Sequence, residues 1–309
     1  MRILFQDNGN FRDEWLQALA KHCPNDEVRV WQSGDQAAAD YAIVWKPDAG
    51  MLAGRENLRA IFSRGAGVDG ILQLGHLLPP GVPLLRLNDA GMGAQMAEYV
   101  MHALLRFYRR FDIYQEQAAQ KHWRPLPAQD RKDFPVGVLG LGVLGQKIIQ
   151  GLLAFDFPVL GWSRNQKELA GVHTYHGWDQ LDAFLAATKV LVCILPLTEE
   201  TRGLLNRQRL AHLPKGAYLI NVARGAHVVE ADLLDLIQQQ HLAGAYLDVF
   251  AEEPLPAAHP FWQEPRISVT PHISAITLID QSVQQIAANM RALEQGQPVT
   301  GLVDLQRGY

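Results

Sequence analysis

A glycine-rich turn is the first feature of this chain whose residue types point to a ligand. Gly140, Gly142 and Gly145 follow a short apolar run and precede a helical pattern. In a strand–turn–helix unit such glycines permit a tight turn, close approach of a pyrophosphate and close packing of the helix. The helix N-terminus, with the backbone N–H groups of Val143 and Leu144, would then bind the phosphates. The spacing predicts a dinucleotide site, although an ordinary strand–turn–helix joint has the same outline.

The residues after the next apolar run bear on which dinucleotide binds. Ser163 lies 18 residues beyond Gly145, about where an NAD-specific unit places an acid on the ribose 2′-hydroxyl. No acid stands there. Ser163 and Arg164, with Lys167 close by, would instead suit a 2′-phosphate, because a guanidinium can pair with phosphate through two hydrogen bonds. We therefore expect NADPH to be preferred and NADH to be used more weakly. The alternative is that Arg164 is a solvated loop charge.

Three titratable residues later in the chain could carry out chemistry on a bound substrate. Arg224 ends an apolar run, and its planar fork of donors suits a carboxylate and a polarised keto oxygen. His272 could donate a proton, and a carboxylate such as Glu253 could be the histidine's charge partner, which would favour the protonated imidazole. Taken singly, a surface arginine or a structural histidine is the more common case. As an ordered set behind a glycine turn, they are what hydride transfer to a 2-oxo acid requires.

The elements that would position these residues alternate between short apolar runs and helical patterns. This alternation predicts parallel sheets covered by helices, in two α/β units. The strands expected in the first unit are 3–6, 28–31, 42–45, 60–63 and 83–87. Those expected in the second unit are 136–139, 158–162, 190–195, 217–222, 244–248 and 267–270.

Helical patterns mark the boundary between the two units. Residues 94–122 contain no Pro or Gly and carry many large apolar groups, which predicts one long helix. That helix would either bridge the two units as a core element or contribute part of a subunit interface. A second helix is expected at 278–295, and the tail 297–309 could return to the first unit.

Composition excludes several classes of partner. The chain has 309 residues and a formal net charge of −4, from 28 basic and 32 acidic side chains. Since these charges are interspersed, no nucleic-acid partner is expected. No apolar stretch approaches the roughly 20 residues that cross a bilayer, so no membrane partner is expected either. The two cysteines, Cys23 and Cys193, make neither a metal spacing nor a disulfide framework, and Cys193 is expected in the core. We expect a soluble cytoplasmic protein without a metal.

With these residues in place, the sequence resembles the D-isomer-specific 2-hydroxyacid dehydrogenases over almost its whole length. Arg224, Glu253 and His272 match the catalytic arginine, glutamate and histidine of that family in the right order. Within the family the chain most resembles the bacterial glyoxylate/hydroxypyruvate reductase A group. Segments 65–69 and 195–198 carry the likeness to the family. The likeness to this group is carried by segments 41–47, 91–96, 162–164 and 307–309.

The resemblance implies a fold and an assembly. A Rossmann-type NADP-binding domain at 96–284 would be inserted into a flavodoxin-like substrate domain made of 1–95 and 285–309. Both domains would be doubly wound parallel sheets, with the active site in the cleft. The family's usual assembly is a homodimer.

The resemblance also implies site residues and an activity. The amides of Ala66, Gly67 and Val68, together with Arg224, would hold a substrate carboxylate, and Trp45 would border the substrate. The residues implied to line the cofactor are Leu195, Pro196, Val222, Ala223 and Asp248. The expected reactions are the NADPH-dependent reductions of glyoxylate to glycolate and of hydroxypyruvate to D-glycerate. Alternatively, Trp45 is only a strand-end core aromatic.

Two other functions remain compatible with these motifs. The first is another dehydrogenase of the same fold, for 3-phosphoglycerate or formate. The end of the chain at Tyr309 leaves no room for a regulatory domain, and formate chemistry would not need His272 to move a proton. The second is a dinucleotide-sensing binding protein with little turnover. Consumption of NADPH with glyoxylate distinguishes a sensor from an enzyme.

Overall fold

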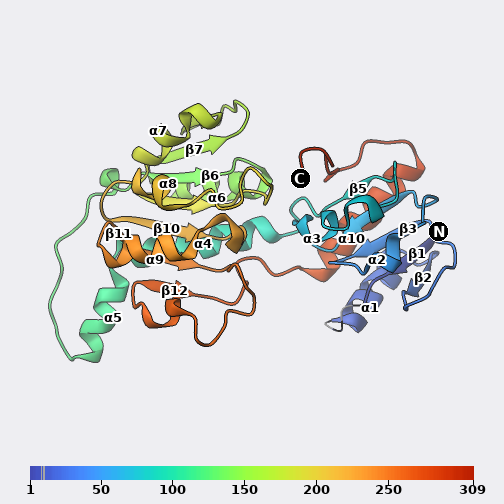
Figure 1. Cartoon of the computed structure of the whole chain (residues 1–309), viewed down its shortest axis with the longest axis horizontal. Helices are drawn as coiled ribbons and strands as arrows, with labels where there is room; N and C mark the ends of the chain where they lie inside the picture. The colour runs from blue at the N-terminus through green and yellow to red at the C-terminus, as the bar shows by residue number, and fades with distance from the viewer. Residues whose placement is uncertain (8, 10) are drawn as a thin grey trace. The chain divides into compact units, whose positions relative to one another are not determined.

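The computed structural model describes residues 1–7, 9 and 11–309, which form two α/β units (Figure 1). Unit 1 comprises Met1–Met92 and Thr277–Tyr309, and unit 2 comprises Gly93–Ile276. The sequence-based junctions, after residues 95 and 284, lie inside α4 (Met92–Tyr108) and α10 (Ile279–Glu294). The structure assigns all of α10 to unit 1, because this helix packs against α1 (Arg12–His22).

Unit 1 is built on a five-stranded parallel sheet with the order β2-β1-β3-β4-β5. This is the flavodoxin-type order. The strands are β1 (Arg2–Phe5), β2 (Glu27–Val30), β3 (Tyr41–Val44), β4 (Ala60–Ser63) and β5 (Leu84–Leu85). All five expected strands are present, and β5 is shorter than its apolar run because only two residues pair with β4.

Both faces of this sheet are covered, since successive side chains of a strand point to opposite sides. Leu4 of β1 joins a buried cluster with Met51 of α2 (Ala49–Leu52) and Ile71 of α3 (Asp69–Leu72). Its neighbour Phe5 stacks on Trp15 of α1, with ring centroids 5.8 Å apart. The short helix η1 (Gly75–Leu77) follows α3.

The C-terminal tail returns to unit 1, as the sequence predicts. Leu302 forms an antiparallel bridge with Leu85, and the Val303 N–H donates to the Leu84 carbonyl at 2.9 Å.

Unit 2 contains a seven-stranded parallel sheet with the order β12-β11-β10-β9-β6-β7-β8. Six of these strands have the Rossmann order, and β12 extends the sheet beyond β11. The strands are β6 (Val136–Leu139), β7 (Val159–Ser163), β8 (Val172–His176), β9 (Val190–Cys193), β10 (Ala217–Asn221), β11 (Leu242–Leu247) and β12 (Ile267–Val269). Sequence reasoning missed β8, because this edge strand is half-exposed and reads Val-His-Thr-Tyr-His rather than as an apolar run.

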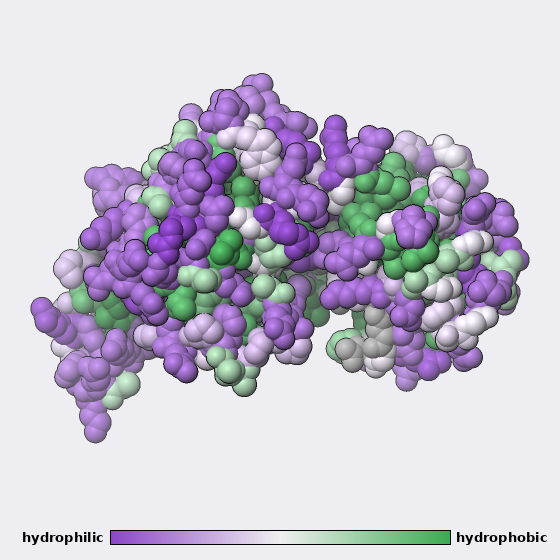
Figure 2. Space-filling view, viewed as in Figure 1, coloured by the Kyte–Doolittle hydropathy of each residue, from purple (hydrophilic) through white to green (hydrophobic). Residues whose placement is uncertain are grey.

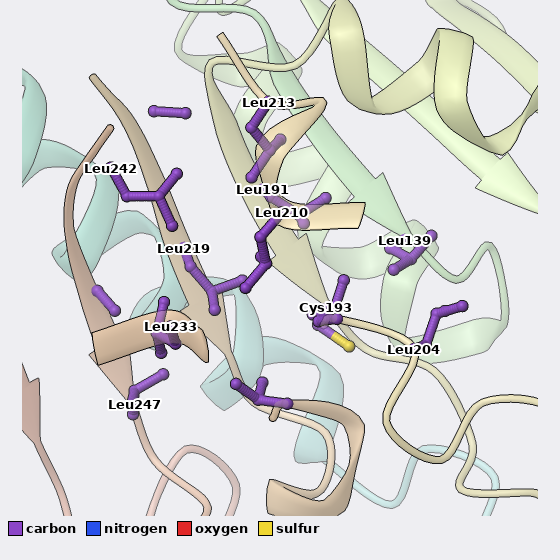
Figure 3. Packing of buried hydrophobic residues seen from close by; sticks show 14 of the residues in the cluster. Leu139, Leu191, Cys193, Leu204, Leu210, Leu213, Leu219, Leu233, Leu242 and Leu247 are labelled. Atoms are coloured by element: carbon purple, nitrogen blue, oxygen red, sulfur yellow. The ribbon is translucent and has the colours of Figure 1, made fainter. Parts of the chain in front are cut away.

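Two apolar layers lie on opposite faces of the unit 2 sheet. Val190 and Val192 face the layer that includes α4 and α6. Leu191 and Cys193 face the layer that includes α7, α8 and α9, part of which Figure 3 shows. The bounds of these helices are α6 (Val143–Ala154), α7 (Leu181–Ala186), α8 (Arg207–Ala211) and α9 (Glu230–Gln238). The structure therefore confirms two doubly wound parallel-sheet units. Cys193 is a fully buried core residue, as predicted, and burial raises the pKa of its thiol to about 12.

The prediction of one helix over residues 94–122 is wrong. α4 ends at Tyr108, and α5 (Phe111–Ala119) starts after Arg110, whose φ of 58° interrupts the helical backbone. Packing explains the break. Phe107 and Tyr108 at the end of α4 are partly buried and pack against the core, whereas α5 buries none of its side chains. α5 and the segment after it extend away from the sheet (Figure 1), and Trp123 in that segment is fully exposed.

The described residues also form four further 3-10 helices: η2 (Arg131–Asp133), η3 (Trp178–Gln180), η4 (Gly225–His227) and η5 (Pro260–Gln263). The face of each unit drawn in Figure 2 is mostly hydrophilic, with smaller hydrophobic patches. Among the residues that the structure describes, no helix has the length and apolarity needed to cross a membrane.

Candidate active site

The predicted glycine turn joins β6 to α6. Gly140 has φ 120°, and a Cβ there would lie 2.9 Å from the Ile194 carbonyl oxygen. A Cβ on Gly145 would lie 2.0 Å from the Gly140 oxygen, so the helix can approach the strand only without a side chain. Gly142 caps α6, and a Cβ there would meet no described atom within 4 Å. The open space at Gly142, beside the N–H groups of a helix N-terminus, fits the pyrophosphate of a dinucleotide.

The predicted 2′-phosphate residues gather at the end of β7. Arg164 forms an ion pair with Glu200. The Lys167 ammonium donates to the Leu141 carbonyl within the glycine turn at 2.7 Å, which ties this corner to the turn. Ser163 is buried, and its hydroxyl donates to the Asn165 carbonyl at 2.7 Å.

The residues implied to line the cofactor follow three neighbouring strands at their carboxyl ends. Leu195 and Pro196 follow β9, Val222 and Ala223 follow β10, and Asp248 follows β11. Because parallel strands end at the same edge, these residues share the ligand-binding edge of the sheet. Backbone hydrogen bonds hold the edge together: Val222 N–H to the Cys193 carbonyl at 3.2 Å and Asp248 N–H to the Asn221 carbonyl at 3.1 Å.

Arg224 stands at the start of η4, directly after the β10 edge. Its Nη1 donates to the Ala223 carbonyl at 2.7 Å. The next residue, Gly225, packs directly on the backbone after β11: a Cβ there would lie 1.8 Å from the Phe250 carbonyl carbon and 2.3 Å from the Ala251 nitrogen. The Arg224 turn and the segment that leads to Glu253 therefore touch backbone to backbone.

Glu253 and His272 form the pair that the sequence predicts. Nδ1 of His272 lies 2.8 Å from Oε2 of Glu253, and Oε1 of Glu253 accepts from the Phe250 N–H at 3.0 Å. A carboxylate only accepts hydrogen bonds, so the contact assigns a proton to Nδ1 and leaves Nε2 for a ligand. The two side chains are 43% and 35% exposed, as a group that must meet a substrate requires.

The backbone under His272 is held by Asp248. His272 has φ 56°, an uncommon value for a residue with a side chain. The fully buried Asp248 carboxylate accepts from the Thr270 hydroxyl at 2.6 Å, the Ile273 N–H at 2.8 Å and the Ser274 N–H at 2.7 Å. These donors flank His272 on both sides, so the carboxylate fixes the loop that carries it.

A hydroxyl from α4 extends this network. The Tyr99 hydroxyl contacts the Thr270 hydroxyl, which donates to Asp248. Burial raises the pKa of Tyr99 above its ordinary range, so its hydroxyl remains protonated at neutral pH.

In unit 1 the predicted substrate loop and Trp45 come together. A Cβ on Gly65 would lie 2.6 Å from the Trp45 ring, so the indole rests on the loop. Ser63 shapes the loop by accepting from the Gly65 N–H at 3.2 Å and donating to the Gly67 carbonyl at 3.1 Å. In the part of the chain that the structure describes, the backbone N–H groups of Ala66, Gly67 and Val68 donate to no protein acceptor. Three such donors can bind an anion.

Two arginines add positive charge around this loop. Arg64 precedes it, and Arg86 has Nη1 3.5 Å from the Ala66 carbonyl oxygen. Burial lowers the pKa of Arg64 to about 10 and also lowers the pKa of Arg86. Both remain cationic at neutral pH, which favours an anionic ligand.

Sequence reasoning missed several residues in contact with the site. His227 is fully buried, with Nδ1 3.0 Å from the Arg224 carbonyl oxygen and Nε2 3.2 Å from the Pro196 carbonyl oxygen. Its position three residues after Arg224 is the sequence feature that could have identified it as a neighbour of the site. Glu200, Tyr99 and Thr270 offered no local motif.

Comparison with known proteins identifies the family to which the sequence is similar. The family profile described as D-isomer specific 2-hydroxyacid dehydrogenase, NAD binding domain, matches residues 101–274. A protein from Serratia proteamaculans named glyoxylate/hydroxypyruvate reductase A is 51% identical, and one of the same name from Photorhabdus laumondii is 49% identical. Both alignments cover 100% of each chain.

Solved structures agree over the full length. A D-isomer specific 2-hydroxyacid dehydrogenase from Xanthobacter autotrophicus, in complex with NADPH and MES, is 40% identical with a TM-score of 0.94, covering 100% of this chain and 99% of that one. An NADPH-dependent glyoxylate/hydroxypyruvate reductase from Sinorhizobium meliloti, in complex with NADP and sulfate, is 37% identical with a TM-score of 0.93, covering 100% of both chains. The family inferred from the motifs is thus confirmed, and the chain belongs to the D-isomer-specific 2-hydroxyacid dehydrogenases.

Proposed function

We propose that this enzyme uses NADPH to reduce short 2-oxo acids, converting glyoxylate to glycolate and hydroxypyruvate to D-glycerate. The observation that carries the proposal is the 2.8 Å contact between His272 and Glu253, on the same unit that holds the glycine turn and Arg164. The full-length relatives named glyoxylate/hydroxypyruvate reductase A support the choice of substrates.

The proton that completes the reduction comes from His272. Glu253 accepts a hydrogen bond from Nδ1–H and so orients the imidazole, which leaves Nε2–H as the donor to the substrate oxygen. Bound NADPH supplies the hydride that reduces the carbonyl carbon. His272 is left neutral and regains its proton from solvent, to which it is exposed.

Each unit contains groups proposed to bind a substrate anion. The Arg224 guanidinium contacts the carboxylate and polarises the keto oxygen, for which its fork of donors is suited. In unit 1, the N–H groups of Ala66, Gly67 and Val68 are the proposed donors to a carboxylate. Trp45, whose ring rests on Gly65, restricts the group at substrate C3 and so favours small 2-oxo acids over branched ones.

NADPH is the preferred cofactor and NADH the weaker one. Gly140, Gly142 and Gly145 form a turn that fits the pyrophosphate, and Arg164 with Lys167 would hold the 2′-phosphate. The NADPH and NADP bound to the related structures support this assignment.

We further propose that the protein is a cytoplasmic homodimer. The described cysteines are free thiols, which are typical of proteins in a reducing compartment. α5 buries no side chain. Its first residue, Phe111, and Trp123 in the segment after it are 47% and 100% exposed, which supports coverage of this region by a second copy. Light scattering would measure the mass of the protein and of a Trp123→Ala variant in solution. A monomeric mass for the unaltered chain would exclude the dimer.

A substrate panel tests the proposed function. Glyoxylate, hydroxypyruvate and a branched 2-oxo acid would each be assayed with NADPH and with NADH. We expect the highest kcat/KM for the two short acids with NADPH. Negligible turnover with every acid would favour a dinucleotide-sensing protein, and a higher kcat/KM for the branched acid would exclude the role given to Trp45.

A further inference from the structure

Glu200 is an acidic side chain at the corner assigned to the 2′-phosphate. It lies in the segment after β9, and Arg164 lies after β7, yet Oε2 of Glu200 pairs with Nη2 of Arg164. The two side chains are 53% and 33% exposed. Arg164 therefore already has an anionic partner at the position where a phosphate would bind.

The backbone beside Glu200 is fixed, which keeps the carboxylate near Arg164. Thr201, only 4% exposed, donates its hydroxyl to the Pro196 carbonyl at 2.8 Å and accepts from the Thr198 N–H at 2.8 Å. These contacts close a compact turn around Glu200. The neighbouring Glu199 lies in the same turn and is exposed.

A carboxylate in this position affects the two cofactors differently. A 2′-phosphate carries about two negative charges, so it must displace Glu200 from the guanidinium or share the guanidinium with a like charge. The 2′-hydroxyl of NADH is uncharged, so it can approach while the ion pair stays intact. Lys167 donates one of its three N–H groups to the Leu141 carbonyl, so it can assist Arg164 with a phosphate but does not separate Arg164 from Glu200.

We propose that Glu200 is a specificity-determining residue: it holds Arg164 as a counter-ion and lowers the affinity for NADPH relative to NADH. The inference rests on the proposed role of Arg164 as the ligand of the 2′-phosphate. It makes cofactor choice the result of competition between a carboxylate of the protein and a phosphate of the cofactor.

The test compares Glu200→Gln with the matched variant Glu199→Gln. Both remove one negative charge from the same turn, and of these two carboxylates it is that of Glu200 that pairs with Arg164 in the described structure. Dissociation constants for NADPH and NADH would be measured by fluorescence titration of the full-length protein. Glu200→Gln should tighten NADPH binding about two- to five-fold, which is the size of effect that exposed ion pairs carry. NADH binding should change little, and Glu199→Gln should leave both constants near those of the unaltered protein.

Other outcomes overturn the proposal. Equal effects of Glu200→Gln and Glu199→Gln would reduce the role of Glu200 to general surface charge. A selective loss of NADH affinity in Glu200→Gln would make the carboxylate a ligand of the ribose hydroxyl instead.

Arg164→Ala separates this inference from the proposed function. If Arg164→Ala weakens NADPH and NADH equally, Arg164 does not bind the 2′-phosphate, and both proposals fail. If it weakens NADPH selectively while Glu200→Gln has no effect beyond that of Glu199→Gln, only the role of Glu200 fails.

Discussion

The loop that carries His272 and the corner that carries Arg164 lie in the same unit but are held in opposite ways. The His272 loop rests on Asp248, which is fully buried and accepts from both the Thr270 hydroxyl and the Ser274 N–H. Arg164 is held by Glu200, which is 53% exposed. One region is fixed by the protein interior and the other by a contact that water can replace.

The energies of these contacts differ accordingly. A buried donor that loses its partner costs about 1–3 kcal/mol, whereas an exposed ion pair contributes about 0–1 kcal/mol. Disturbing the loop that carries His272 is therefore expected to cost more free energy than disturbing the corner where Arg164 is proposed to bind the cofactor phosphate. Substitutions in the first region should lower kcat, and substitutions in the second should alter cofactor affinity.

The largest effect is expected at the proton donor. His272→Ala removes the proposed general acid and should lower kcat for glyoxylate by roughly 100- to 10,000-fold. Steady-state NADPH oxidation measures the loss, and fluorescence titration should find NADPH binding near that of the unaltered enzyme. A kcat within a few-fold of normal would assign the proton transfer to another group.

Arg224→Lys should have the next largest effect. It keeps the charge but loses the planar fork, so both substrate binding and stabilisation of the developing oxyanion should weaken. We expect kcat to fall about 100-fold, the scale on which one oxyanion donor acts, and the KM for glyoxylate to rise. Selective loss of NADPH affinity would instead move Arg224 to the cofactor site.

Asp248→Asn tests whether the buried carboxylate positions His272. The amide keeps the side-chain size but turns one acceptor into a donor that faces N–H or hydroxyl groups. We expect kcat to fall about 5- to 150-fold, the kinetic equivalent of one unsatisfied buried group. Thermal melting would establish that the variant is folded. Weaker NADPH binding with an unchanged kcat would make Asp248 a direct cofactor ligand, as the family resemblance implies.

Arg164→Ala tests the exposed corner that carries Arg164 and Glu200. Loss of a charge-assisted contact with phosphate should raise the Kd for NADPH about 10-fold or more, with kcat near normal at saturating NADPH. The Kd for NADH should stay almost constant. A fall in kcat at saturation would contradict the separation of the two regions.

Tyr99→Phe should give the smallest effect. It removes the hydroxyl that contacts Thr270 at the far end of the Asp248 network, so stability should fall by about 0.5–1.5 kcal/mol and kcat should change little. Chemical denaturation measures the change. Tyr246→Phe is the matched control, because its ring packs edge-on against Tyr99 at 5.4 Å. Equal losses in both variants would exclude a specific role for the Tyr99 hydroxyl.

The features of the site that could be predicted from the sequence are those that depend on local patterns rather than on tertiary contacts. The glycine turn and the strand ends before Arg224 and His272 are local patterns, and the structure contains each at its expected strand end. The partners of these residues are not local. Glu200 is 36 residues from Arg164 and Thr270 is 171 residues from Tyr99, so no local sequence motif predicts either contact.

The two errors in the predicted secondary structure also arise from tertiary contacts that local sequence patterns do not reveal. No Gly or Pro marks the end of α4, and the partly buried aromatic residues of its last turn pack against the core. β8 joins the sheet through backbone pairing with β7, which requires no apolar run.

The contact at Gly225 limits where this enzyme can be re-engineered. With 1.8 Å between a would-be Cβ and the Phe250 backbone, even alanine would push the Arg224 turn away from the Glu253 segment. A library that randomises this turn would therefore consist mostly of inactive members, whatever substrate is selected. Variation at Trp45 leaves that backbone contact untouched. A search for activity on larger 2-oxo acids should begin there.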